Sequence, residues 1–490
     1  METNPMLIIS TSKSVSEVID GLAASALSKR FGMIGPLALA LLLTGCTGFS
    51  TPGERAARSR AETAAARYRP NGHKPTLPQL TATSSLRNFL TFALLNQPKV
   101  EVAYYDWRAS IERITQARSL PDPQFTFQMD IQTIVTSVMP GLMGAIPWPD
   151  KLRVGADMAS SASQAKYFAF QSAVLESAFD VKRSYYQLYF LDEKIHVNQD
   201  TLKLLAELEK LARSRNEVGK VTLQDVLRAQ IEQDRLKTDV ANLEDSRSSL
   251  AAQFKAALGL GGNDPMPPLP SSFESTSLDI TADKLFKTAL AQNTRLKAIE
   301  ADVHAAEAGL ILAGKSDRPD FSLGLMVDGK MKPTMYRPLG TVSLPIWRDK
   351  TASLIAEAQS NKLVAQAQLS GEKNALAVDI AQRTFLYREA TRNLALLNDQ
   401  ILPKARQSLE VARSGYLADQ IDFFNLTDTE RSLLGYQLEK VEAAAQREIV
   451  LAELSMIIQG MPPANGSMAP KPAGIPNGKS ATSRKTSGGM

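Results

Sequence analysis

The sequence predicts a mainly α-helical protein with a small β part, in which short strand hairpins alternate with long antiparallel helical hairpins. Three observations predict this class. Two long segments, 152–258 and 351–459, carry helical patterns with one turn inside each. Two shorter segments, 121–151 and 319–350, alternate apolar and polar residues as strands do. The second copy of each kind of segment lies about 200 residues after the first, which indicates a tandem duplication.

Composition bounds the class further. The 490 residues are 44% hydrophobic but only 6% aromatic, so the chain can bury ample apolar surface yet lacks the aromatic content of a large compact core. The net charge of +5 is mild, and basic residues are interleaved with acidic ones along the helical segments. We therefore expect no nucleic-acid partner.

One long apolar run lies near the N-terminus, at residues 31–43. It is about thirteen residues long, which is too short to span a bilayer as a helix, and it follows the basic pair Lys29-Arg30. A basic region, an apolar region and small residues before a cleavage point are typical of a secretory signal. We predict that residues 1–45 form a lipoprotein signal peptide.

The segment Leu43-Thr44-Gly45-Cys46 resembles the bacterial lipobox. Cys46 is the only cysteine, so an internal disulfide is excluded, and we predict that its thiol is acylated with palmitate or a similar chain. The alternative is a chance free thiol within a signal. Thr47, rather than an aspartate, follows the cysteine, and in lipoproteins of this kind that favours sorting to the outer membrane.

The other divisions follow from composition and periodicity. Residues 46–84 are polar with little periodicity, so we expect an acylated tether that lies on a larger surface. A helix is expected at 86–119, and its counterpart at 280–314. The divisions are repeat 1 at 85–262, a linker at 263–279, repeat 2 at 280–460 and a disordered tail at 461–490.

Each strand segment begins at a Pro-Asp turn and alternates for about ten residues, the length and pattern of a tilted strand in a membrane barrel. One side of the alternation is apolar. It comprises Phe125, Phe127, Met129 and Ile131 in the first copy and Phe321, Leu323, Leu325 and Val327 in the second. Trp148 and Trp347 stand at matching ends, and we expect them at a membrane interface.

The number of strands constrains the assembly. Each repeat supplies about two strands, and about four strands cannot close a barrel, because the smallest filled barrels need about eight. Open strand edges in lipid would leave backbone N–H and C=O groups unpaired. If these strands lie in a membrane, several chains must share one barrel. The helical hairpins would then continue its wall as an α-helical cylinder.

The helical hairpins turn at 218–222 and at 418–420. Thr222 is a suitable N-cap for the first return helix. That helix carries a narrow apolar seam of the coiled-coil kind, which Arg247 interrupts. In the second hairpin, Pro403 should kink or interrupt the outgoing helix.

The turn of the first hairpin carries a specific pattern. It consists of Gly219, Thr222, Asp225, Val226, Leu227 and Ala229. Together with the lipobox and the twofold repeat, this pattern resembles the TolC-type outer-membrane efflux family over residues 46–460. The segment 146–152 is most similar to heavy-metal efflux members of that family.

The resemblance implies a homotrimer in the outer membrane of a Gram-negative bacterium, anchored by lipid and extending into the periplasm. Its trimeric α-barrel would continue a shared twelve-stranded β-barrel with four strands per chain. The implied function is the exit duct of a tripartite efflux pump, which passively conducts substrates delivered by a periplasmic adaptor and an inner-membrane pump. It implies no enzyme activity and no cofactor.

The resemblance also assigns residues at the hairpin turns. In the family, the second turn carries two acidic residues that ring the periplasmic entrance; here Asn425 and Asp428 stand at those positions. Asn425 has lost the charge, so Asp428 is the better gate residue. Three symmetry-related carboxylates would concentrate cations at a narrow axis. The alternative is that Asp428 lies on a solvated helix face.

Residues at both turns are the expected adaptor contacts. They are Val218, Gly219, Thr222, Asp225, Ala418 and Asp419. Asp419 stands where the first turn has Gly219, and this substitution would favour a different turn, because Asp adopts left-handed geometry less readily than Gly.

Other candidate sites are weaker. His73, His196 and His304 are widely separated and lack metal-ligand spacing, so we expect no metal site from them. Methionines cluster in the strand segments, where packing is favoured over a soft-metal relay. They are Met129, Met139, Met143, Met326, Met331 and Met335.

Two other classes of protein remain. The main alternative is a periplasmic coiled-coil lipoprotein acting as an adaptor or structural spacer, although an adaptor would have one helical hairpin flanked by β-rich segments. An enzyme is less favoured, because the sequence has no Ser-His-Asp or paired-carboxylate arrangement that suggests a reaction.

Overall fold

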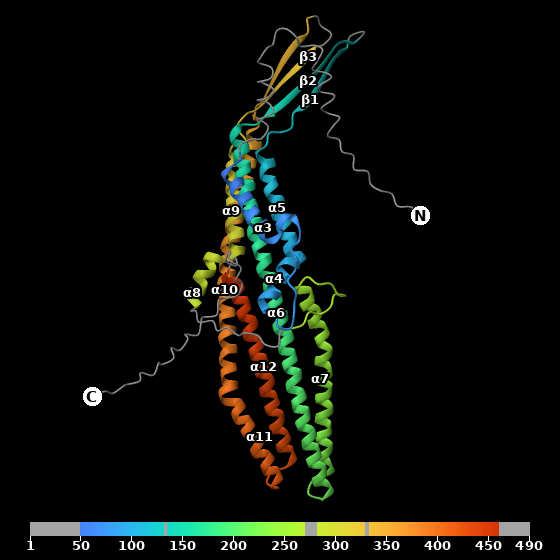
Figure 1. Cartoon of the computed structure of the whole chain (residues 1–490). Coiled ribbons are helices and arrows are strands. Elements are labelled where there is room, and N and C mark those ends of the chain that lie inside the picture. The colour runs from blue at the N-terminus through green and yellow to red at the C-terminus, as the bar shows by residue number, and fades with distance from the viewer. Residues whose placement is uncertain (1–49, 132–134, 270–281, 329–332, 460–490) are drawn as a thin grey trace, which may run out of the picture. The chain divides into compact units, whose positions relative to one another are not determined.

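The computed structural model describes residues 50–131, 135–269, 282–328 and 333–459 (Figure 1). The expected signal peptide, Cys46 and the expected tail lie outside the described residues. The chain divides into two compact units. We call Arg118–Pro147 with Phe321–Thr341 the strand unit, and Pro52–Ala117, Trp148–Asp320 and the chain from Val342 onward the helical unit.

The strand unit is a four-stranded sheet in the order β1-β2-β3-β4. Its strands are β1 (Gln124–Ile131), β2 (Val135–Ile146), β3 (Asp320–Asp328) and β4 (Met335–Ser343). Each predicted strand segment thus contains two strands. The pairs β1–β2 and β2–β3 are antiparallel, and the second pair joins the two repeats. β1 and β4 lie at the two ends of the described sheet.

The register of the sheet separates its two faces. Phe125, Leu142 and Leu325 are directly paired across three strands, and all three side chains are exposed. Their sequence neighbours Thr126 and Met326 pair with Gly141 on the opposite face, where Met326 is buried. The predicted apolar side is therefore the more exposed one, the reverse of the pattern in a water-soluble sheet.

In the described residues of the first half, one α-helix lies in the tether segment and four lie in repeat 1. They are α3 (Pro52–Tyr68), α4 (Leu86–Asn96), α5 (Pro98–Arg118), α6 (Pro149–Glu217) and α7 (Leu223–Ala257). Helix α6 has 69 residues and is about 100 Å long at 1.5 Å per residue. In the described part of the chain, the helices lack the combination of length and hydropathy needed to cross a membrane.

Repeat 2 has the same plan with one irregularity. Its helices are α8 (Ala282–Gln292), α9 (Thr294–Gly314), α10 (Arg348–Leu396), α11 (Leu402–Leu417) and α12 (Phe423–Gln459). A π-helical segment, η2 (Leu397–Ile401), separates α10 from α11. The interruption expected at Pro403 is thus a π turn just before it, which accommodates the missing amide hydrogen of the proline.

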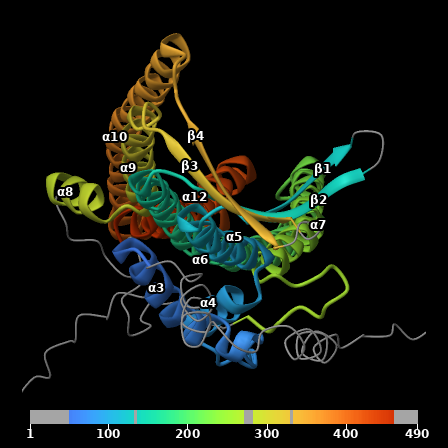
Figure 2. The ribbon, with the colours of Figure 1, turned by 90° about the horizontal axis from the view of Figure 1, so that it is seen from above.

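Helices of the two repeats pack together within the helical unit. α6 packs against α7 of its own repeat and against α9 and α12 of the other, and α10 packs against α9 and α12 (Figure 2). The two helical hairpins are therefore joined by the packing of α12 against α6.

Two expectations need correction. The helix expected at 86–119 is two helices, α4 and α5, which meet at Gln97-Pro98 because the proline cannot continue the first one. The tether segment contains helix α3, whose low hydrophobicity concealed it. α3 is held by the buried carboxylate of Glu54, which accepts a 2.8 Å hydrogen bond from Thr115 of α5.

The junction of α4 and α5 caps the end of α7. The side-chain amide of Gln97 donates to the carbonyls of Ala256 and Ala257, at 3.0 and 3.1 Å. Asn96 donates to the carbonyls of Leu258 and Gly259. These bonds satisfy carbonyls that have no partner within the helix. Gly259 has a φ of 72°, and a Cβ there would lie 2.7 Å from the carbonyl oxygen of Asn96, so glycine is required.

Candidate functional site: the turns of the helical hairpins

The turns of the two helical hairpins are bound to each other. Arg215, near the end of α6, donates to the backbone carbonyl of Tyr416 and pairs with the carboxylate of Asp419. Its guanidinium lies 4.7 Å from the centre of the Tyr416 ring. Lys220 adds a second cation, 3.4 Å from Asp419. We call Arg215, Lys220, Tyr416 and Asp419 the tip contact.

The first turn ends α6 in a Schellman motif. The amide of Gly219 donates to Asn216 and that of Lys220 to Arg215, both at 2.9 Å. Gly219 has the positive φ, 74°, that this motif requires. Thr222 and Asp225 then form a capping box at the start of α7, as the Thr222 N-cap prediction required.

The second turn has the same geometry despite its different sequence. Asp419 has a φ of 58°, and the amide of Gln420 donates to Gly415 at 2.8 Å. The expectation of a different turn is therefore wrong. Left-handed geometry costs an L-residue roughly 1–2 kcal/mol. The pairing of the Asp419 carboxylate with Arg215 and Lys220 opposes that cost.

Above the turns, α7 and α12 touch through polar side chains. Arg431 of α12 pairs with Glu232 of α7, which Arg235 also contacts at 3.3 Å. The guanidinium of Arg228 lies 4.8 Å from the Phe424 ring. Beneath these contacts lies an apolar cluster that α6, α7, α11 and α12 share, which we call the tip cluster. Its buried members are Leu208, Ala212, Val226, Ala229, Leu402, Leu409, Ala412, Tyr416, Phe423, Leu426 and Leu433.

The predicted gate residues lie on the exposed side of α12. Asn425 and Asp428 are both exposed, whereas Phe423, Leu426 and Leu433 are buried. Five of the expected adaptor-contact residues are exposed as well, and Asp225 is partly buried. In one chain these positions are accessible to a partner or to further copies.

Sequence reasoning missed a buried carboxyl group, Glu430 of α12. Its side chain is 3% exposed, and its Oε1 has no hydrogen-bond partner among the described residues. Burial, and secondarily the charge of Glu232, raises the pKa of Glu430 to about 8. The signal was present in the sequence: Glu430 follows Leu426 by four residues and precedes Leu433 by three, so it occupies an apolar seam position.

The equivalent position in repeat 1 is occupied differently. Gln230 donates to the carboxylate of Glu209 at 2.9 Å, and Arg213 and Gln233 bind the same carboxylate. These bonds, that from Arg213 above all, lower the pKa of Glu209 to about 2. In repeat 2 the position that matches Glu209 is the buried Leu409. The carboxylate that Gln230 binds in repeat 1 therefore has no counterpart at the matching position of repeat 2.

The bases of the strand hairpins are tied together within the helical unit. Lys151 pairs with Asp320 at 3.0 Å and donates to the carbonyl of Arg318. The amide of Trp148 also donates to Asp320, at 2.9 Å. Trp148 is partly buried, whereas Trp347 is 71% exposed.

The remaining candidates do not gather into a site. Among the described residues, no three His, Cys, Asp or Glu side chains are placed to hold a metal ion. Met139 and Met326 lie on one face of the sheet and Met129 on the other. Met331 lies outside the described residues.

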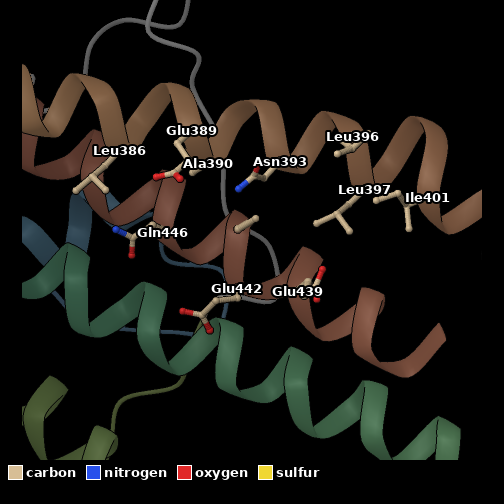
Figure 3. A pocket seen from close by; sticks show the side chains of 11 residues that line it. Leu386, Glu389, Ala390, Asn393, Leu396, Leu397, Ile401, Glu439, Glu442 and Gln446 are labelled. Atoms are coloured by element: carbon tan, nitrogen blue, oxygen red, sulfur yellow. The ribbon is translucent and has the colours of Figure 1, made fainter. Parts of the chain in front are cut away.

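A groove of about 540 Å³ lies between α10 and α12 beside the π turn (Figure 3). Apolar side chains such as Leu386 and Leu397 line it together with the carboxylates of Glu389, Glu439 and Glu442. Glu442 is paired with Lys194 of α6. The groove marks where the extra residue of the π turn changes the packing of α10 on α12.

Two strand hairpins and two long helical hairpins, related by duplication, define the class of the chain: its fold is that of the outer-membrane efflux channels. Solved structures of such channels are similar to it. VceC from Vibrio cholerae is 16% identical with a TM-score of 0.66 over 77% of this chain and 96% of that one. The CmeC channel of Campylobacter jejuni is 13% identical with a TM-score of 0.66, over 79% and 90%. The open MtrE channel of Neisseria gonorrhoeae is 16% identical with a TM-score of 0.65, over 79% and 94%.

A family model matches part of the sequence. Residues 90–260 match the family model described as Outer membrane efflux protein. No curated protein matches the chain. The predicted resemblance to the TolC-type family is confirmed over residues 90–260 by the family match, and the solved channels share the fold.

Proposed function

We propose that the protein is the exit duct of a tripartite efflux system, a homotrimer that passively conducts substrates across the periplasm and the outer membrane. The single observation that carries the proposal is the four-stranded sheet with an exposed apolar face. Phe125, Phe127 and Leu323 are 72%, 56% and 61% exposed on that face. Lipid is the solvent in which such a face is stable.

The sheet also needs neighbours. β1 and β4 stand at its ends, and in lipid the backbone groups of an unpaired edge would each cost several kcal/mol. Pairing β1 of one copy with β4 of the next removes both edges. Three copies of four strands give a closed barrel of twelve strands, within the range that membrane barrels adopt.

The helical unit supports the same assembly. Leu223, Leu227 and Ile231 are exposed along α7. α10 carries a second exposed apolar set, which consists of Leu363, Val364, Val378 and Phe385. Two exposed apolar edges on one chain suit a ring in which each copy packs α7 against the neighbour's second hairpin, forming an α-helical barrel.

The proposal also assigns roles to the lipidation site, the two tryptophans and the turns of the helical hairpins. Acylation of Cys46 would anchor the chain to the outer membrane, with Trp148 and Trp347 at the membrane interface. The exposed turns around Val218 and Ala418 would contact a periplasmic adaptor, and an inner-membrane pump would supply the energy. Asp428 of three copies would surround the entrance and favour cations there.

The test is the purified mature protein in detergent. We expect a trimer by light scattering and single-channel conductance in planar bilayers. A monomer that stays soluble without detergent and forms no channels would refute the proposal. That result would favour the alternative, a periplasmic coiled-coil lipoprotein that serves as an adaptor or spacer.

A further inference from the structure

We propose that Glu430 is a proton-controlled switch in the contact between α12 and the first helical hairpin, so that the duct opens more readily as the pH rises. The proposal rests on the proposed function and adds a mode of regulation to it. It is carried by a buried carboxyl group whose Oε1 finds no hydrogen-bonding partner in the described chain, at the place where the two hairpins meet.

The first step is the position of Glu430. It shares the buried face of α12 with Leu426 and Leu433, two members of the tip cluster. Its side chain is only 3% exposed, and Oε1 has no hydrogen-bond partner in the part of the chain that the structure describes. An ionised carboxylate is strongly disfavoured at such a position, whereas the neutral acid is tolerated.

The second step is the set of charges around it. On α7, Glu232 faces Glu430 and adds repulsion. Arg431 and Arg235 are both engaged with Glu232, and Arg228 lies against the Phe424 ring. The charged groups near Glu430 on α6, α11 and α12 are either paired with another residue or exposed to water.

On α6, Glu209 is bound by Arg213, and Arg215 belongs to the tip contact. On α12 itself, Asp428 is exposed. The charged residues of α11 are also exposed; they are Lys404, Arg406, Glu410 and Arg413. Within the described residues, no cation pairs with Glu430, so protonation is the means by which its charge is removed.

The third step is the sign of the pH dependence. With α12 packed, burial raises the pKa of Glu430 from 4.5 to about 8. When α12 moves away and water reaches the carboxyl group, the pKa returns toward its ordinary value. The packed state therefore binds the proton more tightly. Its advantage is complete below about pH 4.5 and is lost as the pH rises through about 8, by about tenfold per pH unit in the ratio of packed to separated states.

The other repeat supplies the test variant. Gln230 occupies the matching position in the first hairpin and is uncharged at every pH. Glu430→Gln therefore introduces a side chain that the fold already accommodates at the equivalent place and removes the titration. Glu410→Gln is the matched control, because Glu410 is an exposed glutamate on the neighbouring helix α11.

The experiment measures open probability in planar bilayers between pH 5.5 and 8.5 for the wild type and both variants. We expect it to rise with pH, by up to tenfold per unit, in the wild type and in Glu410→Gln, and to be low and nearly constant in Glu430→Gln. The same pH dependence in Glu430→Gln as in the wild type, or none in the wild type, would overturn the inference.

A second measurement separates this inference from the proposed function. Hydrogen–deuterium exchange of residues 423–433 in detergent needs no conductance, and each variant is compared with the wild type at equal pH. We expect the wild type to exchange faster than Glu430→Gln, by a much larger factor at pH 8 than at pH 5.5. If no variant conducts but this difference appears, the proposed function fails and the switch stands; if channels form and exchange is identical throughout, only the switch fails.

Discussion

The tip contact makes a prediction about opening that can be worked out from the structure. Asp419→Asn removes the carboxylate that pairs with Arg215 and Lys220 but keeps a residue that adopts positive φ readily. Arg215 is 9% exposed, whereas Asp419 is 53% exposed, so water screens the pair from one side only. The pair should therefore be weaker than a fully buried charged hydrogen bond. We expect Asp419→Asn to reduce the free energy that holds the two turns together by roughly 1–2 kcal/mol.

A loss of that size shifts the ratio of joined to separated turns by about 5- to 30-fold. If separated turns conduct, open probability in planar bilayers should rise by up to that factor. Arg215→Met should give a similar rise, and the double variant should give less than the product of the two single factors, because both changes remove the Arg215–Asp419 pair.

Asp419→Gly supplies the control for the turn itself. Glycine restores the residue of the first turn and relieves the left-handed strain, so the hairpin should stay folded while the charge is lost. If Asp419→Asn and Asp419→Gly both conduct like the wild type, the tip contact does not hold the duct closed, and its pairing serves only the turn.

Three further predictions concern other parts of the chain. Gln97→Ala removes one of the donors to the Ala256 carbonyl and the side-chain donor to the Ala257 carbonyl, and should lower the unfolding free energy by roughly 1–3 kcal/mol, measured by thermal unfolding in detergent; Gln97→Glu, which cannot donate, should not restore it. Asp428→Ala should raise conductance and reduce cation preference in bilayers, and Asn425→Asp should increase cation preference; unchanged ion selectivity in both would remove the gate role. Gly141→Val should reduce trimer yield, because its Cβ would lie 2.5 Å from Met326 Cγ and 2.9 Å from the Leu325 carbonyl; a wild-type yield would show that the sheet adapts.

The long elements could be predicted because their patterns are long. The 69 residues of α6 contain no internal proline, and period-two alternation persists through β1 and β3. The duplication then predicted the order of the second half. Helix α3 was missed because its buried face is small, with Glu54 and Ala57 among its buried residues. Such a helix is stabilised by tertiary contacts that periodicity does not reveal.

The polar contacts of the hairpin turns could not be predicted, because they join residues about 200 positions apart. Neither Arg215 nor Asp419 has a local feature that predicts the other, and the turn at Asp419 was misjudged for this reason. Its left-handed geometry looked unfavourable when only the local backbone was considered. The partner that opposes the cost lies in the other repeat.

The duplication has kept the backbone of the two hairpins alike while their polar interiors diverged. Both turns are Schellman motifs, at Gly219 and Asp419. In the first hairpin, Glu209 is stabilised as an anion and should remain so as the pH falls until it approaches about 2. In the second, Leu409 replaces it and Glu430 is stabilised as a neutral acid. Because the pKa of Glu209 is lowered and that of Glu430 is raised to about 8, a change of pH near neutrality alters the charge at the second of these two sites and not at the first. This difference between Glu209 and Glu430 would allow pH to move the second helical hairpin while the first stays in place.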